Sequence, residues 1–166
     1  IYATVVGNIF EAVQRGYNYE LTEADVERGT WVDYTRYKDS TLQEYLSTGA
    51  LMNSFSRDIA RWWHGEDGFD VLVTPTSARP APALGDLVSD PDDRNGRFRD
   101  TFAYTSQFNF SGQPAVSLPL GESSEGVPVG VQFVGRYGDE QTLIQLAAEL
   151  EEELPWNDRK PTISAE

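Results

Sequence analysis

Residues 104–135, YTSQFNFSGQPAVSLPLGESSEGVPVGVQFVG, carry the clearest strand and turn signals in the chain. Two apolar, β-branched runs at 115–119 and 127–134 flank a polar loop bounded by glycines, and this pattern predicts two strands joined as a hairpin. The polar residues before them predict a short helix or turn over 100–109. The stretch contains serines but neither His nor Cys. It therefore predicts the wall of a binding site and not the catalyst itself.

The segments around this hairpin predict helices. A helix is expected from Thr22, as N-cap, to about Lys38. A second, over 40–63, shows apolar residues mostly three to five positions apart, the spacing of an amphipathic helix. A third is expected over 140–153, preceded by Asp139 as cap. Residues 1–13 mix β-branched residues with a glycine and leave their type open.

Residues 69–74, FDVLVT, form a nearly continuous apolar run that Pro75 closes. Such a run predicts a buried, parallel strand. The long Pro-, Gly- and Asp-rich stretch at 78–100 predicts a loop. The fold class is therefore α/β, with a mixed β-sheet flanked by helices. We expect one segment over 1–166, mostly helical over 1–65, with strands and a closing helix over 69–154 and a tail at 155–166.

Composition narrows the possible functions. The net charge of −14 repels phosphate backbones, so we expect no nucleic-acid partner. No apolar run reaches the roughly 18–20 residues of a membrane span, so no membrane association is expected either. The chain has no cysteine, which excludes disulfides and thiolate metal sites and makes a cytoplasmic location the default. Because the first residue is Ile1 and not Met, we expect a piece of a longer protein.

Few residues suit catalysis on their own. His64, the only histidine, follows two tryptophans at the end of a predicted helix, where a structural role fits better than a catalytic one. A lone histidine among scattered carboxylates lacks metal-ligand spacing, and no phosphate-binding loop is present, so neither a metal nor a cofactor is expected. Thr74-Pro75-Thr76 follows a strand, where α/β sheets place ligands. Local chemistry leaves open whether such residues bind a ligand or only turn the chain.

Three motifs occur in a fixed order and spacing over 69–150, and together they resemble the C-terminal part of the amidase signature family. They are Asp70-Val-Leu-Val-Thr-Pro75-Thr76, Asn109-x-Ser-Gly112-x-Pro114-Ala115-x-Ser-x-Pro119, and Gly126-Val-Pro128-Val-Gly130-Val-Gln132-x-Val-Gly135.

The resemblance implies hydrolysis of a small-molecule amide by a Lys–cis-Ser–Ser triad, in which one serine attacks the carbonyl and a second relays its proton to the lysine. The lysine and the Gly-Gly-Ser-Ser-Gly-Gly segment of that family are not in this sequence. Lys38 and Lys160 are the only lysines, and neither matches the family's setting. We therefore expect no catalytic residue here and no activity from this chain alone. Its implied partner is the missing N-terminal part, with homo-oligomerisation as the other way to cover an exposed sheet edge.

The resemblance also implies a pocket. Glutaminase subunits of tRNA-dependent amidotransferases carry an Asp seven residues before the position of Asn109, and this chain carries Phe102 there. An apolar ring cannot pair with an ammonium group, so an apolar amide of the aryl, acyl or 6-aminohexanoate type is favoured over glutamine. A glutaminase of that kind and a non-catalytic scaffold of the same fold remain alternatives. The implied substrate-binding residues are Thr74, Pro75, Thr76, Phe102, Thr105, Gln107, Phe108 and Asn109, of which Asn109 is expected to fix the turn.

Overall fold

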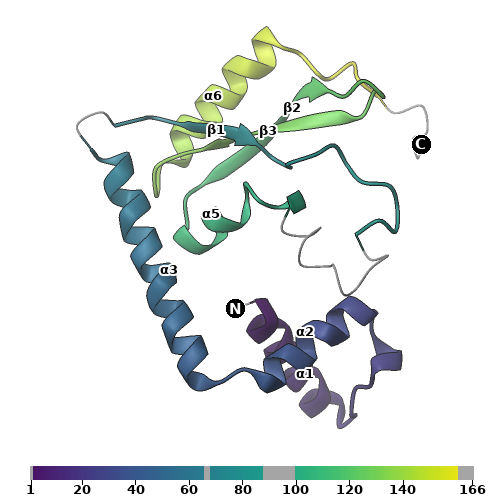
Figure 1. Cartoon of the computed structure of the whole chain (residues 1–166). Helices are drawn as coiled ribbons and strands as arrows, with labels where there is room; N and C mark the ends of the chain where they lie inside the picture. Colours follow the sequence, from purple (N-terminus) through teal and green to yellow (C-terminus); the bar gives the residue numbers. More distant parts are fainter. Residues whose placement is uncertain (1, 66–67, 88–99, 161–166) are drawn as a thin grey trace. The chain divides into compact units, whose positions relative to one another are not determined.

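The computed structural model describes residues 2–65, 68–87 and 100–160 (Figure 1). The chain divides into two compact units, one formed by the described residues of 1–53 and 83–98 and the other by those of 54–82 and 99–166. The elements are α1 (Tyr2–Tyr17), η1 (Glu23–Asp25), α2 (Arg28–Asp39), α3 (Leu42–Trp63), β1 (Leu72–Pro75), α5 (Ser106–Ser111), β2 (Ala115–Glu122), β3 (Pro128–Val134) and α6 (Glu140–Glu153).

The first unit is built on the pair of helices α1 and α2. Phe10 and Tyr34 stack with their ring centroids 4.5 Å apart, and both rings are buried. Gln14 joins the helices to the loop between them, since its side chain donates to the Tyr34 hydroxyl and accepts from the backbone N–H of Leu21. This unit therefore has a small aromatic core of its own.

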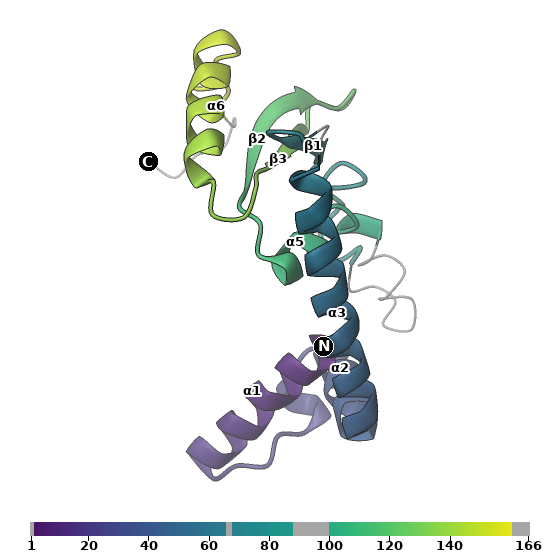
Figure 2. The same ribbon diagram turned by 90° about the vertical axis from the view of Figure 1, so that its left-hand side faces the viewer.

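The second unit is a three-stranded sheet in the order β1-β3-β2, and every pairing in it is antiparallel. One face packs against α6 through a cluster centred on Leu118, Phe133 and Leu143. The other face packs against α5 and the end of α3 through Trp63, Phe108 and Val134. Figure 2 shows α6 on one side of the sheet and α5 on the other. The sheet thus has two differently covered faces.

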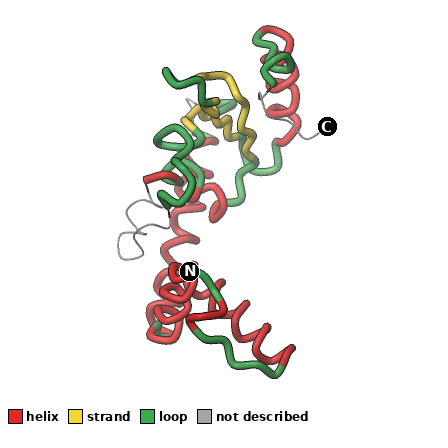
Figure 3. Tube along the Cα trace, turned by 90° about the vertical axis from the view of Figure 1, so that its right-hand side faces the viewer, coloured by secondary structure: helices red, strands yellow, loops and turns green. Residues whose placement is uncertain are grey.

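The α/β class with helices flanking a sheet is confirmed, as are the hairpin and the bounds of α6 (Figure 3). The parallel, buried strand predicted over 69–74 is wrong: β1 runs antiparallel to β3, and Val73 is 55% exposed. The apolar run misled because β1 is an outer strand, and a central position is what buries both faces of a strand.

Three helix predictions change as well. The ambiguous N-terminal segment is helical over most of its length as α1. The single helix expected over 22–38 is broken: Thr22 caps only the short η1, and α2 starts at Arg28. Asp139 precedes α6, but its carboxylate accepts from the Thr142 hydroxyl at 2.9 Å and not from a backbone N–H. In the described residues no helix has the length and apolar character needed to cross a bilayer.

Candidate functional site

A row of polar side chains crosses the sheet on the face that also carries Leu72 and Val134. The register sets Gln132, on the central strand, directly opposite Thr74 on β1 and Ser117 on β2. Because side chains alternate between the faces of a strand, these three share one face with Thr76, two positions beyond Thr74. The row begins where the apolar cluster of Trp63, Phe108 and Val134 ends, so this face of the sheet is half apolar and half polar. The residues of the polar row are Thr74, Thr76, Ser117 and Gln132.

Gln132 is the buried centre of this row, with 4% of its surface exposed. Its amide nitrogen donates to Thr74 Oγ1 at 2.9 Å and to the backbone oxygen of Tyr104 at 2.8 Å. The same backbone oxygen accepts a second hydrogen bond, of 3.1 Å, from the side chain of Gln107. Thr74 and Gln107, which lie far apart in the sequence, are therefore joined through Gln132.

Thr76 and Ser117 form a pair of hydroxyls, with 2.6 Å between Thr76 Oγ1 and Ser117 Oγ. They reach each other across β3 because Gly130 lies between them. A Cβ added at Gly130 would sit 2.8 Å from each of the two hydroxyl oxygens. In the described part of the chain, no lysine, histidine or carboxylate is hydrogen-bonded to either hydroxyl. The pair can donate to and accept from a ligand, but it lacks a base that would make a nucleophile of either oxygen.

The segment that leads into β2 is closed by its own hydrogen bonds. Gly112 adopts a left-handed conformation with φ of 77°, and its N–H bonds the backbone oxygen of Phe108 at 2.9 Å. A Cβ at Gly112 would meet the ring of Tyr137 at 3.1 Å. Ser111 donates to the backbone oxygen of Gln107 and bonds the side chain of Gln113. Glycine is needed here for both its backbone conformation and its small size.

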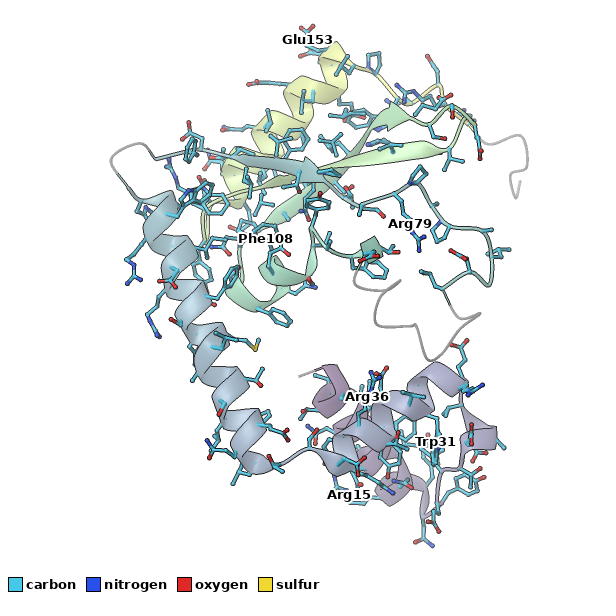
Figure 4. All side chains as sticks on the ribbon, viewed as in Figure 1. Arg15, Trp31, Arg36, Arg79, Phe108 and Glu153 are labelled. Atoms are coloured by element: carbon cyan, nitrogen blue, oxygen red, sulfur yellow. The ribbon has the colours of Figure 1, made fainter. Side chains whose placement is uncertain are left out.

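The structure brings some of the predicted pocket residues together and separates others. Thr74, Thr76 and Gln107 meet at the polar row or its hydrogen-bond network. Pro75 lies opposite Val131, on the sheet face that α6 covers. Phe108 is 5% exposed and lies in the core, where α5 faces the sheet (Figure 4).

The other three predicted residues lie on or next to α5. Phe102 is 37% exposed, and its backbone oxygen accepts from the N–H groups of Thr105 and Ser106. Thr105 is the residue that precedes the first turn of α5. Asn109 is exposed on that helix. Their contact with a substrate stays a prediction.

The polar row has no charged group of its own, and its chemistry is that of neutral hydroxyls and amides. Among the described residues no three His, Cys, Asp or Glu side chains are grouped as metal ligands would be. The shifted pKa values that the chain shows lie elsewhere, in the turns that begin η1 and α3. Backbone N–H donation from Thr22 lowers the pKa of Asp25, and donation from Thr41 lowers the pKa of Glu44. The row is thus suited to holding a polar group in place and not to transferring protons.

Sequence reasoning did not select Gln132 or Ser117 as site residues, although both stand in the family's motifs. Their signal was a polar side chain at an inward position of an otherwise apolar strand. A buried polar group needs a partner, so an inward Gln in a strand indicates a specific hydrogen bond. That signal could have identified Gln132 but not its partner, the backbone oxygen of Tyr104.

Comparison with known proteins gives the following likenesses. The family model named Amidase matches residues 6–144. The chain is 40% identical over 151 residues to a 6-aminohexanoate-cyclic-dimer hydrolase from Paenarthrobacter ureafaciens, which covers 86% of this chain and 30% of the relative. It is 40% identical over 94 residues to a glutamyl-tRNA(Gln) amidotransferase subunit from Thermodesulfovibrio yellowstonii, which covers 57% of this chain and 19% of that protein.

A solved structure of 6-aminohexanoate cyclic dimer hydrolase superposes with a TM-score of 0.86 at 36% identity, over 96% of this chain and 34% of its own. The chain thus spans about a third of the length of these hydrolases, as the 30% and 34% figures show.

Proposed function

The chain belongs to the amidase family, and on that premise we propose that it is a C-terminal portion of an amide hydrolase. In this proposal the Lys–cis-Ser–Ser triad comes from the remainder of the protein. The present residues supply part of the sheet and the substrate-side wall. The observation that carries the proposal is the hydrogen-bonded link between Thr74, Gln132, the Tyr104 backbone and Gln107, which joins two of the family's motifs at one place.

The proposed substrate is a small amide with apolar substituents, of the kind named by the 6-aminohexanoate-cyclic-dimer hydrolase relative. Phe102 supports this choice, because an aromatic ring that is 37% exposed offers an apolar contact and no partner for the α-ammonium of glutamine. The likeness to the amidotransferase protein covers 57% of this chain and keeps glutamine as the second candidate.

The experiment uses the longer protein that contains these residues, assayed with the cyclic dimer of 6-aminohexanoate, an aryl amide and glutamine. We expect kcat/KM for the two apolar amides to exceed that for glutamine by more than tenfold. Faster hydrolysis of glutamine would favour the amidotransferase alternative. A protein that hydrolyses none of the three, and whose upstream sequence lacks the lysine and the Gly-Gly-Ser-Ser-Gly-Gly segment, would favour the scaffold alternative.

The 166-residue chain supplies a second, independent test. Purified free of any longer form, it is expected to hydrolyse no amide, because the polar row has no base and the triad residues are missing from the sequence. Turnover of an aryl amide by this preparation would show that the chain holds its own catalyst and would contradict the proposal.

Phe102 is tested by Phe102→Asp in the longer protein. We expect kcat/KM for the apolar amides to fall by about tenfold or more, the range that a lost apolar contact produces in a pocket. Phe110→Asp is the matched control, since Phe110 is also partly exposed, at 47%, and lies outside the predicted pocket. Equal effects of the two changes would remove Phe102 from the pocket.

A further inference from the structure

Two segments that the proposed function assigns to the substrate wall, the Thr-Pro-Thr end of β1 and residues 102–109, are far apart in the sequence and need a physical tie. The structure gives three contacts between them. Ala78 N–H bonds the backbone oxygen of Thr101, and Arg79 bonds its hydroxyl, each at 3.4 Å. The third contact is the 2.8 Å bond from Gln132 to the Tyr104 backbone oxygen. The third is the shortest, and it is made from the central strand of the sheet.

The chemistry at Gln132 suits a glutamine and few other residues. Both of its acceptors lie on the same side of the amide, and one of them is a backbone oxygen that cannot donate. The side chain must therefore present its NH₂ group, which carries two hydrogens for two acceptors. Serine and threonine have a single hydroxyl donor, and a lysine ammonium would have to be buried as a charge. The side chain is also buried, with 4% exposed, so its geometry is set by packing as well as by hydrogen bonds.

The oxygen that Gln132 holds is a shared acceptor. Tyr104 O receives the amide of Gln132 from the sheet side and the amide of Gln107 from α5. Moving this oxygen would therefore move the start of α5 and the side chain of Gln107 with it. Thr74 is tied to the same nitrogen at 2.9 Å, so one atom sets the separation between the strand end and the helix.

We propose that Gln132 is a positioning residue that fixes segment 102–109 against the Thr-Pro-Thr end of β1 and so determines the width of the substrate wall. This inference rests on the proposed function for its substrate, but its structural part does not depend on any amidase activity. Gln132 is not a catalytic residue in this scheme, because it acts through Tyr104 and Thr74.

The first arm of the test measures backbone hydrogen exchange in the 166-residue chain. Gln132→Met keeps the length of the side chain and removes both donors. We expect protection of the amides over 105–112 to fall by at least tenfold, while the β2–β3 hairpin amides change by less than about threefold. Unchanged protection over 105–112 would overturn the proposal.

A second variant covers the case in which Gln132→Met does not fold. Gln132→Glu keeps the shape, and its carboxyl can donate to Tyr104 O only when it is protonated. We expect the protection of 105–112, divided by that of the hairpin at the same pH, to be low at neutral pH and to recover in acid. Thr74→Val is the control, since it leaves the bond to Tyr104 intact and should leave this ratio unchanged. A ratio that does not vary with pH in Gln132→Glu would contradict the assignment.

The second arm uses the longer protein and an apolar amide substrate. Gln132→Met is expected to raise KM by at least fivefold and to leave kcat within about threefold, because a displaced wall weakens binding without touching the triad. A purely structural role would reduce the amount of active enzyme and lower the apparent kcat at constant KM, and that result would overturn the inference. If the longer protein cleaves no amide at all, the proposed function fails while the exchange arm still decides the role of Gln132.

Discussion

Gly7 is the residue whose replacement the structure constrains most tightly. A Cβ at this position of α1 would lie 2.0 Å from Cγ of Tyr37 and 2.2 Å and 2.5 Å from the two Cδ atoms. These are ring atoms beside the backbone, and the ring packs in the cluster of Phe10 and Tyr34, so it has little room to move away. Glycine therefore allows α1 and α2 to approach closely.

The change Gly7→Ala tests this contact. Alanine gains about 0.5–1 kcal/mol in a helix interior, whereas forced overpacking costs about 1–3 kcal/mol. We expect overpacking to win and the urea midpoint to fall. Gly49→Ala is the matched control, because Gly49 is also inside a helix and a Cβ there meets nothing within 4 Å. That variant should be slightly more stable. A Gly7→Ala protein as stable as Gly49→Ala would show that the two helices do not pack as described.

Gly130 poses the same question in the sheet, where the obstacle is the pair of hydroxyls. We expect Gly130→Ala to raise the hydrogen-exchange rate of β3 amides, because its methyl group would sit 2.8 Å from both Thr76 Oγ1 and Ser117 Oγ. Adding Ser117→Ala removes one of these oxygens and should restore part of the protection. Additive losses in the double variant would contradict the proposed clash.

At the scale of an element, the start of α3 is stabilised by a capping box. Thr41 N–H and hydroxyl both donate to one carboxylate oxygen of Glu44, at 2.8 Å and 2.9 Å, and the N–H of Glu44 donates back to the Thr41 hydroxyl. The pattern Thr-x-x-Glu is visible in the sequence and is a recognised helix-start signal. Donation to the charged carboxylate lowers the pKa of Glu44, first through the Thr41 backbone and then through its hydroxyl.

The sign of the pH effect follows from that direction. Because the pKa of Glu44 is lower in the folded chain than its usual value of 4.5, the box stabilises the helix above that pH. The stabilisation is lost as the pH falls through the lowered pKa. We expect Glu44→Gln to lower the thermal midpoint at pH 7 and to differ less from the parent chain below about pH 4. Glu149→Gln, an exposed change of equal charge on α6, should show no such convergence. Parallel curves for Glu44→Gln and the parent would contradict the capping role.

The elements also show where sequence reasoning succeeds and where it stops. The apolar periods of α3 and α6 and the glycine-bounded hairpin were enough to place these elements. For α1 the β-branched residues obscured a helix, and the stacking of Phe10 on Tyr34, which the sequence cannot reveal, fixes it. The direction of β1 failed for a similar reason, since an apolar run does not specify its strand partner. The site was recovered as far as Thr74, Thr76 and Gln107 by motif order, whereas the tie made by Gln132 depends on a backbone oxygen.

At the scale of the whole molecule, the sheet has open sides. In the described residues β1 and β2 are the outer strands of the order β1-β3-β2, so each has one backbone edge with no strand beside it. Val73 on β1 is 55% exposed, and Ile144 on α6 is 69% exposed. Strand edges with apolar side chains tend to pair with other chains. The proposed partner is the remaining part of the amidase, and a second copy of this chain is the alternative when that part is missing.

This edge predicts a self-association that depends on salt in an unusual direction. The net charge of −14 repels a second copy at low ionic strength, whereas the screening length falls from about 10 Å at 0.1 M salt to about 3 Å at 1 M. Apolar edge contacts survive this screening, so sedimentation should show a larger associated fraction at 1 M salt. Val73→Lys places a charge on the β1 edge and should reduce association, whereas Ser124→Lys, an equal charge change in the hairpin loop, should not. A chain that stays monomeric at every salt and protein concentration would show that these edges do not associate, and would leave the missing part as the only proposed partner.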